Sequence, residues 1–208
     1  MHKAKRDHLP RDMDASPFSV IMAGLLRRLP GAFAACLVDK DGEAVDYSGA
    51  IDPYDIKVAA AHWQIVFTEF GRQKTLRGTR HVVLVLEKSS AILRALPEGY
   101  VLVVLLGKYG GFYHTERALS ACENALAREA GWKLPQEHSW FAVTVTSDAT
   151  GRPARIVYGG LEENVEVVGS LRGHGRERGY RVRLASGPEI TIVREPGDFW
   201  YVEEHFRN

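Results

Sequence analysis

Apolar residues recur every three or four positions after Ser16, and this period predicts an amphipathic helix. The apolar positions are Phe18, Ile21, Met22, Leu25 and Leu29. Ser16 supplies a hydroxyl that can cap the helix, and Pro17 suits its first turn. We therefore expect the folded part of the chain to begin at Ser16.

The next segment has the pattern of a hairpin. Residues 32–38 are apolar on both faces, as in a strand that helices cover on each side. Residues 39–42, Asp-Lys-Asp-Gly, form a turn, and polar and apolar side chains then alternate over residues 43–48, as near a sheet edge. The acidic turn lacks the ligand spacing of an EF-hand, so we interpret it as a tight hairpin.

A second helix is predicted after Asp52, which supplies an N-cap, with Pro53 at the first helical position. One apolar stripe on this helix comprises Ile56, Ala59, Ala60, Trp63, Val66, Phe67 and Phe70. The stripe is widened by Val58, Ala61 and Ile65. It exceeds what one sheet face covers, so we expect a protein interface there; the alternative is cover by a loop or by the C-terminal region.

Three further strands are expected at residues 78–86, 89–96 and 100–106, followed by a closing helix at about residues 115–130. This order of elements, with the segment Leu29-Pro30-Gly31 and the turn after Val38, resembles the roadblock family. The resemblance implies an α+β fold: a five-stranded antiparallel sheet with helices on both faces.

The resemblance also implies a function. Roadblock proteins are generally not enzymes; they form homodimers or heterodimers and act as scaffolds or regulators for small Ras-like GTPases or dynein motors. In such dimers the second helices pack together and the third strands pair. Carried over to this sequence, the dimer interface would comprise Trp63, Val66, Phe67, Phe70, Val83 and Val85.

After Trp132 the pattern changes to short strand-like runs separated by turn residues, which predicts a small all-β unit resembling an SH3-like module. We expect a half-open barrel of five or six strands; the first run, residues 140–146, could instead extend the preceding sheet or bridge the two units. The predicted organisation is a flexible tail (1–15), a roadblock-like domain (16–133) and a small β-barrel-like domain (134–208).

Composition changes this picture little. The 208 residues carry 27 Lys and Arg against 26 Asp and Glu, a net charge of +1, so no global field favours nucleic acid or an anionic membrane. No apolar run reaches the ~20 residues that cross a bilayer, and the two cysteines, Cys36 and Cys122, have the surroundings of buried hydrophobic residues. We expect a cytoplasmic protein that does not insert into membranes.

No catalytic motif is evident. Lys108 precedes its glycines and is followed by Tyr109, so the segment is not a P-loop. The histidines lack the spacing of metal ligands, and neither cysteine has the electropositive surroundings of a nucleophile. We expect no enzymatic activity, no metal and no cofactor.

Two basic segments remain, at residues 72–81 and 172–179, the second rich in Gly and Arg. The residues expected to bind a partner are Arg72, Lys74, Arg77, Arg80, Arg176 and Arg178. We expect a dimeric adaptor or regulator that binds itself and a small GTPase or another signalling protein. The alternative is a nucleic-acid or ligand-binding β module dimerised by the roadblock-like half; nucleic acid is disfavoured because nine Arg are outweighed by ten Asp and Glu over residues 138–208.

Overall fold

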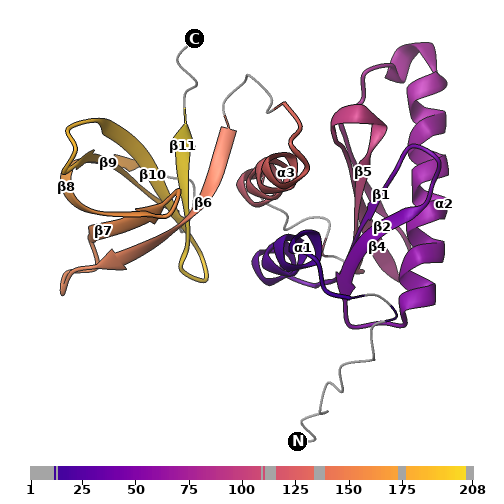
Figure 1. The fold of residues 1–208 in the computed structure, drawn as a ribbon, viewed down its shortest axis with the longest axis horizontal. Helices are drawn as coiled ribbons and strands as arrows, with labels where there is room; N and C mark the ends of the chain where they lie inside the picture. Colours follow the sequence, from indigo (N-terminus) through magenta and orange to yellow (C-terminus); the bar gives the residue numbers. More distant parts are fainter. Residues whose placement is uncertain are drawn as a thin grey trace, which may run out of the picture. The chain divides into compact units, whose positions relative to one another are not determined.

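A computed structural model describes residues 12, 14–108, 110, 116–133, 139–172 and 177–204, without the side chains of residues 172 and 204 (Figure 1). Contacts between Cα atoms divide the chain into two compact units. One consists of Met1–Thr115 and Leu126–Lys133, the other of Glu116–Ala125 and Leu134–Asn208. The boundary expected after residue 133 stays a prediction.

The first unit contains an antiparallel five-stranded sheet with the strand order β2-β1-β5-β4-β3, which confirms the predicted α+β fold. Its strands are β1 (Ala32–Val38), β2 (Ala44–Gly49), β3 (His81–Val85), β4 (Ser89–Ala95) and β5 (Val101–Gly107). The expected start of the third strand at Gly78 is wrong. A 3-10 turn, η1 (Lys74–Leu76), and a positive φ of 84° at Gly78 keep the chain out of the extended conformation until His81.

Helix α1 (Pro17–Arg28) is capped by Ser16, whose side chain accepts the backbone N–H of Phe18, as predicted. Asp46 of β2 reinforces this end of the helix. Its carboxylate accepts the backbone N–H of Ser19 at 3.0 Å and the hydroxyl of Ser16. A carboxylate at a helix N-terminus satisfies free N–H groups and complements the helix dipole, so β2 and α1 support each other.

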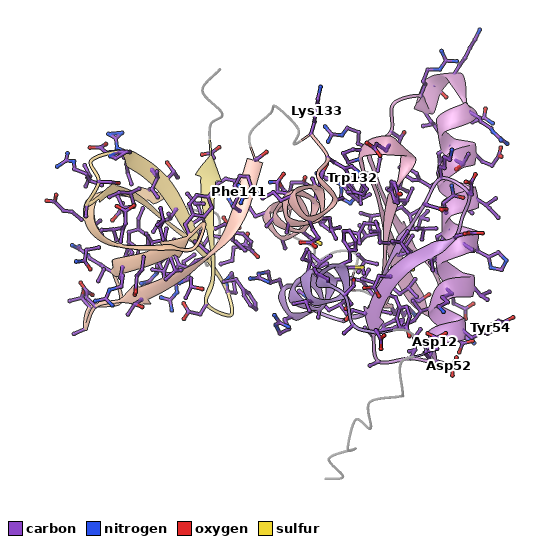
Figure 2. All side chains as sticks on the ribbon, in the orientation of Figure 1. Asp12, Asp52, Tyr54, Trp132, Lys133 and Phe141 are labelled. Atoms are coloured by element: carbon purple, nitrogen blue, oxygen red, sulfur yellow. The ribbon has the colours of Figure 1, made fainter. Side chains whose placement is uncertain are left out.

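Helix α2 (Pro53–Arg72) begins at the predicted cap, Asp52, which accepts the N–H of Tyr54 at 2.9 Å. Asp12 lies near the start of this helix (Figure 2), where it accepts hydrogen bonds from Lys57 at 2.6 Å and from the Tyr47 hydroxyl at 2.7 Å. The two helices α1 and α2 cover opposite faces of the sheet (Figure 1). Both faces of the central strands are therefore buried, as their continuous apolar sequence predicts.

A closed six-stranded barrel forms the second unit, with the order β10-β11-β6-β7-β8-β9. Its strands are β6 (Ser139–Ser147), β7 (Pro153–Tyr158), β8 (Leu161–Arg172), β9 (Arg178–Leu184), β10 (Glu189–Glu195) and β11 (Phe199–Glu204). The small all-β unit and its six strand-like runs are confirmed, but the barrel is closed and not half-open as expected. β8 begins earlier than predicted, and its first four residues, 161–164, pair with β7. Gly159 and Gly160 both have positive φ and make a tight turn, so the strand begins at once, at Leu161.

The first barrel strand does not extend the other sheet, so that alternative is wrong. β6 pairs with β11 through its first half and with β7 through its second half. Phe141 of this strand lies within the barrel (Figure 2) and packs there with other buried side chains. They are Ile156, Tyr180, Val182, Ile192, Trp200 and Val202. Trp200 thus belongs to the core of the barrel.

Part of helix α3 (Glu116–Ala130) groups with the barrel. Asn124 donates through Nδ2 to the carbonyl oxygen of Trp140 at 2.8 Å, and the Ser120 hydroxyl accepts the backbone N–H of Trp140 at 3.3 Å. The Arg117 guanidinium lies 4.8 Å above the Trp140 ring and forms ion pairs with Glu195 at 2.9 Å and Glu177 at 3.1 Å. These contacts hold the first turns of α3 against β6 and β10.

Candidate protein-interaction surface

The edge of the sheet at β3 is only partly covered. β3 is the last strand in the sheet order and pairs with β4, with Val82 opposite Leu93. Helix α2 lies mainly over β1 and β2. Leu93 and Val103 are fully buried in the cluster under this helix, whereas Val82 and Leu84 are only half-buried at its margin. Val82 and Leu84 therefore leave part of their apolar surface uncovered at the β3 edge of the sheet.

The outer side of α2 carries further apolar side chains. Ile65 is 57% exposed and Val66 is 37% exposed. Val58, two turns before Ile65, is also exposed. Residues seven positions apart lie on the same side of a helix, so Val58 and Ile65 form a line, with Val66 beside it. These side chains on α2 and the partly uncovered Val82 and Leu84 of β3 are together called the α2–β3 surface.

The six residues expected in a dimer interface fall into two groups. Val66 is exposed, and Val85 at the end of β3 is 44% exposed. Half-buried side chains make up the rest: Trp63, Phe67, Phe70 and Val83. Trp63 and Phe67 pack partly against the core under α2. Because side chains alternate along a strand, Val83 and Val85 lie on the sheet face opposite Val82 and Leu84.

Sequence reasoning gave less weight to Val58 and Ile65. The signal was present: both lie outside the stripe formed by the buried Ile56 and Ala60. An apolar residue on the far side of an amphipathic helix marks surface that the helix's own sheet cannot cover.

The first basic segment is exposed at the end of α2. Arg72 is paired with Glu69 one turn earlier in the helix. Lys74 and Arg77 are exposed, and neither makes an ion pair within the described part of the chain. Leu76 lies exposed between them. Arg80 anchors the segment to the sheet, because its carbonyl oxygen accepts the N–H of Ala95 at 2.8 Å.

The second basic segment is less positive than its sequence suggests. Arg176 lies outside the described residues, and Arg178 is exposed at the start of β9. Further along the strand, Arg181 and Arg183 are paired with Glu189, and Arg183 also with Glu166. In the described ranges 139–172 and 177–204, seven Arg face ten Asp and Glu, a difference of −3. This balance gives no general attraction for nucleic acid.

Cys36 and Asp39 belong to residue types that can serve in catalysis or metal binding, but here both have structural roles. Burial raises the pKa of the Cys36 thiol to about 12, the reverse of what a nucleophile needs. Asp39 accepts the N–H groups of Asp41 and Glu43, each at 2.9 Å, and so stabilises the predicted hairpin turn. Among the described residues, no three His, Cys, Asp or Glu side chains gather as a metal site would require.

No helix in the described ranges is both long enough and apolar enough to cross a bilayer.

Comparison with known proteins gives matches at the level of structure. No protein-family model matches the sequence, and no curated protein matches it. A roadblock/LC7 domain from Streptomyces avermitilis is 20% identical with a TM-score of 0.45, over 54% of this chain and 97% of that one. MglB of Myxococcus xanthus is 16% identical with a TM-score of 0.48, over 57% of this chain and 98% of its own.

A third similar structure is the gliding protein MglB of Thermus thermophilus, 18% identical with a TM-score of 0.45, over 57% of this chain and 94% of that one. The matches cover the first part of the chain, where the sequence pattern resembles the roadblock family. The first part of this chain is thus similar to solved roadblock/LC7-domain and MglB structures.

Proposed function

We propose that this protein is a non-enzymatic, homodimeric adaptor or regulator that binds a small Ras-like GTPase or another cytoplasmic signalling protein. The observation that carries the proposal is the α2–β3 surface: Ile65 and Val66 expose apolar area on α2, and the edge strand β3 has half-buried apolar side chains. Exposed apolar side chains and a free strand edge are typical of protein interfaces.

A second copy of the chain suits this surface better than an unrelated protein. An edge strand offers unpaired backbone groups to another strand, and the same strand of a second copy matches it in length and register around a two-fold axis. On α2, a helix of the second copy can pack along the line formed by Val58 and Ile65, because their seven-residue spacing keeps both side chains on one side of the helix. In this proposal the dimer interface comprises the α2–β3 surface.

The basic segment after α2 is the proposed contact for the partner. Lys74 and Arg77 flank the exposed Leu76, a combination of charge and apolar area that suits an acidic surface with an apolar centre. Nucleic acid has less support as a partner, because the barrel carries more acidic than basic groups in its described ranges.

Dimerisation is tested by light scattering after gel filtration. The wild-type protein should have twice the mass of one 23.2 kDa chain. Ile65→Glu and Val66→Glu, each a charge on the α2–β3 surface, should shift it to the monomer. Val20→Glu is the control, because Val20 is also apolar and is even more exposed than Ile65 and Val66 but lies on α1. A monomeric wild type, or a dimer that both variants leave intact, contradicts the proposed interface.

Partner binding is tested by affinity capture from lysate on the immobilised protein, with GDP or a GTP analogue in the buffer. A Ras-like GTPase should be retained in one nucleotide state, and Arg77→Glu should reduce its retention while the dimer persists. Arg152→Glu, a substitution on the barrel, is the control. If a variant loses the dimer but still retains the GTPase, then partner binding does not depend on dimerisation.

A further inference from the structure

Two arginines face each other across neighbouring strands of the barrel. Arg178 of β9 is the register partner of Arg194 on β10, and on its other side the backbone of Arg172 in β8 is its partner. Directly opposite residues of antiparallel strands place their side chains on the same sheet face, about 5 Å apart at Cβ. Like charges in this relation repel each other, so the arginine pair, Arg178 and Arg194, is unfavourable unless negative charge offsets it.

The arginine pair is at an inward-facing register. Arg178 is two residues before Tyr180, and Arg194 is two residues after Ile192; both Tyr180 and Ile192 belong to the barrel core. Side chains two apart on a strand share a face, so Arg178 and Arg194 continue the inner face beyond the core. Arg194 is also opposite Trp200, and its guanidinium lies 5.6 Å from the Trp200 ring centre. The arginine pair therefore stands at one mouth of the barrel.

A carboxylate offsets the positive charge of only one member of the arginine pair. Arg194 donates through Nε to Asp198 at 2.8 Å. Arg178 has no ion pair with an acid in the described part of the chain. The outward-facing arginines of the same strand differ from it, because Arg181 and Arg183 each pair with Glu189. Among the described residues, Arg178 is thus the arginine of β9 whose charge is left without an ion-pair partner.

A pocket opens at this place. It has a volume of about 360 Å³ and is lined by Arg178, Arg194, Glu195, Pro196, Gly197 and Asp198. Pockets for small ligands begin near this size and are common in the mouths of barrels. Asp198, at a positive φ of 65°, is fixed by hydrogen bonds from Arg194 and from Trp200 Nε1. Glu195 is held by Arg117. Arg194, Glu195 and Asp198 thus have fixed orientations in the pocket lining.

We propose that this barrel mouth binds a small phosphate-bearing ligand of the nucleotide class. A phosphate bridging Arg178 and Arg194 supplies the negative charge that the arginine pair lacks. Each guanidinium group can donate two parallel hydrogen bonds to phosphate oxygens. The exposed carboxylate of Asp198 accepts hydrogen bonds from hydroxyl or amino groups, which a nucleotide carries and free phosphate does not. The site belongs to the barrel and goes beyond the adaptor function proposed above.

The test is titration calorimetry of the full chain with inorganic phosphate, a nucleoside monophosphate and the matching nucleoside. The monophosphate should bind more tightly than phosphate, and the nucleoside should not bind measurably. Arg178→Gln should reduce the affinity for the monophosphate at least tenfold, which is the loss expected for one charge-assisted contact. Arg181→Gln, on the same strand but facing outward and paired with Glu189, should leave binding unchanged.

A second measurement separates binding from folding. Without ligand, Arg178→Gln should raise the midpoint of thermal unfolding by about 1–3 °C, because it removes one of two like charges. The proposal is overturned by absence of saturable monophosphate binding, by equal affinity for phosphate and monophosphate, or by full affinity in Arg178→Gln. Binding of single-stranded oligonucleotides that strengthens with length would overturn it as well, because a site for one phosphate does not sense chain length.

Discussion

The carboxylate of Asp46 accepts the backbone N–H of Ser19 at 3.0 Å and is almost fully buried between β2 and α1. A buried carboxylate is stable only when hydrogen bonds replace its lost hydration, and here the first turn of the helix supplies them. The second strand and the first helix are therefore fastened to each other by one side chain.

Replacing that side chain should loosen the first unit. Asp46→Asn keeps the shape but removes the charge that complements the helix N-terminus, and we expect a loss of about 1–3 kcal/mol in the free energy of unfolding. Urea unfolding followed by circular dichroism measures it. Asp41→Asn, in the exposed hairpin turn, is the control and should change stability by less than about 0.5 kcal/mol.

The Asp12 carboxylate should titrate at unusually low pH. The hydrogen bond from Lys57, with a further one from Tyr47, holds the pKa of Asp12 below its ordinary value of 3.8. Because the pKa is lower in the folded state, its stabilising contribution is present above 3.8 and is lost as the pH falls through the lower value. In an NMR titration, Lys57→Gln should move the pKa upward. An identical titration curve in wild type and variant would contradict the contact.

Loss of Arg117 should destabilise the second unit. Glu195 is only 4% exposed, and Arg117 is its ion-pair partner. Arg117→Met leaves a buried carboxylate without this partner and should cost about 2 kcal/mol, since breaking buried pairs is expensive. In a double-mutant cycle, Glu195→Gln should recover part of the loss. If the two single losses simply add, the pair contributes nothing of its own.

Cys36 should be inert in the folded protein. Burial raises the pKa of its thiol to about 12, so hardly any thiolate exists at pH 8. Thiol reagents should label Cys36 only after denaturation, as peptide mass analysis would reveal. Because the folded state holds this proton more tightly, its contribution to stability is present below the ordinary value of 9.0 and is lost as the pH rises from there toward 12. Rapid labelling at pH 8 under native conditions would contradict this.

The features that could be predicted from the sequence are local ones. Ser16 and Asp52 cap their helices as expected, because a capping side chain acts on N–H groups within a few residues of itself. The five sheet strands followed from runs of apolar residues. The start of β8 cannot be predicted in this way, because residues 162–164, Glu-Glu-Asn, are three polar residues in a row and break the alternation of apolar and polar positions that indicates a strand.

The features that could not be predicted depend on register. Arg178 and Arg194 become neighbours only through the pairing of β9 with β10, and a register shift between Val167 and Gly169 sets which residue of β8 meets Arg178 on its other side. Likewise, periodicity marked α2 as apolar on several sides. Only the position of the helix over β1 and β2 shows that Ile65 is outside and Ile56 is inside.

The contacts of Trp140 with α3 determine where a fragment that contains the barrel alone can begin. The first half of β6 pairs with β11, and at Trp140 the backbone groups on its other side are satisfied by Ser120 and Asn124. A fragment cut at residue 134 would bare that strand and offer it to other chains as a template for aggregation. A soluble cassette, or a fusion that transplants the barrel to another protein, should start no later than Glu116.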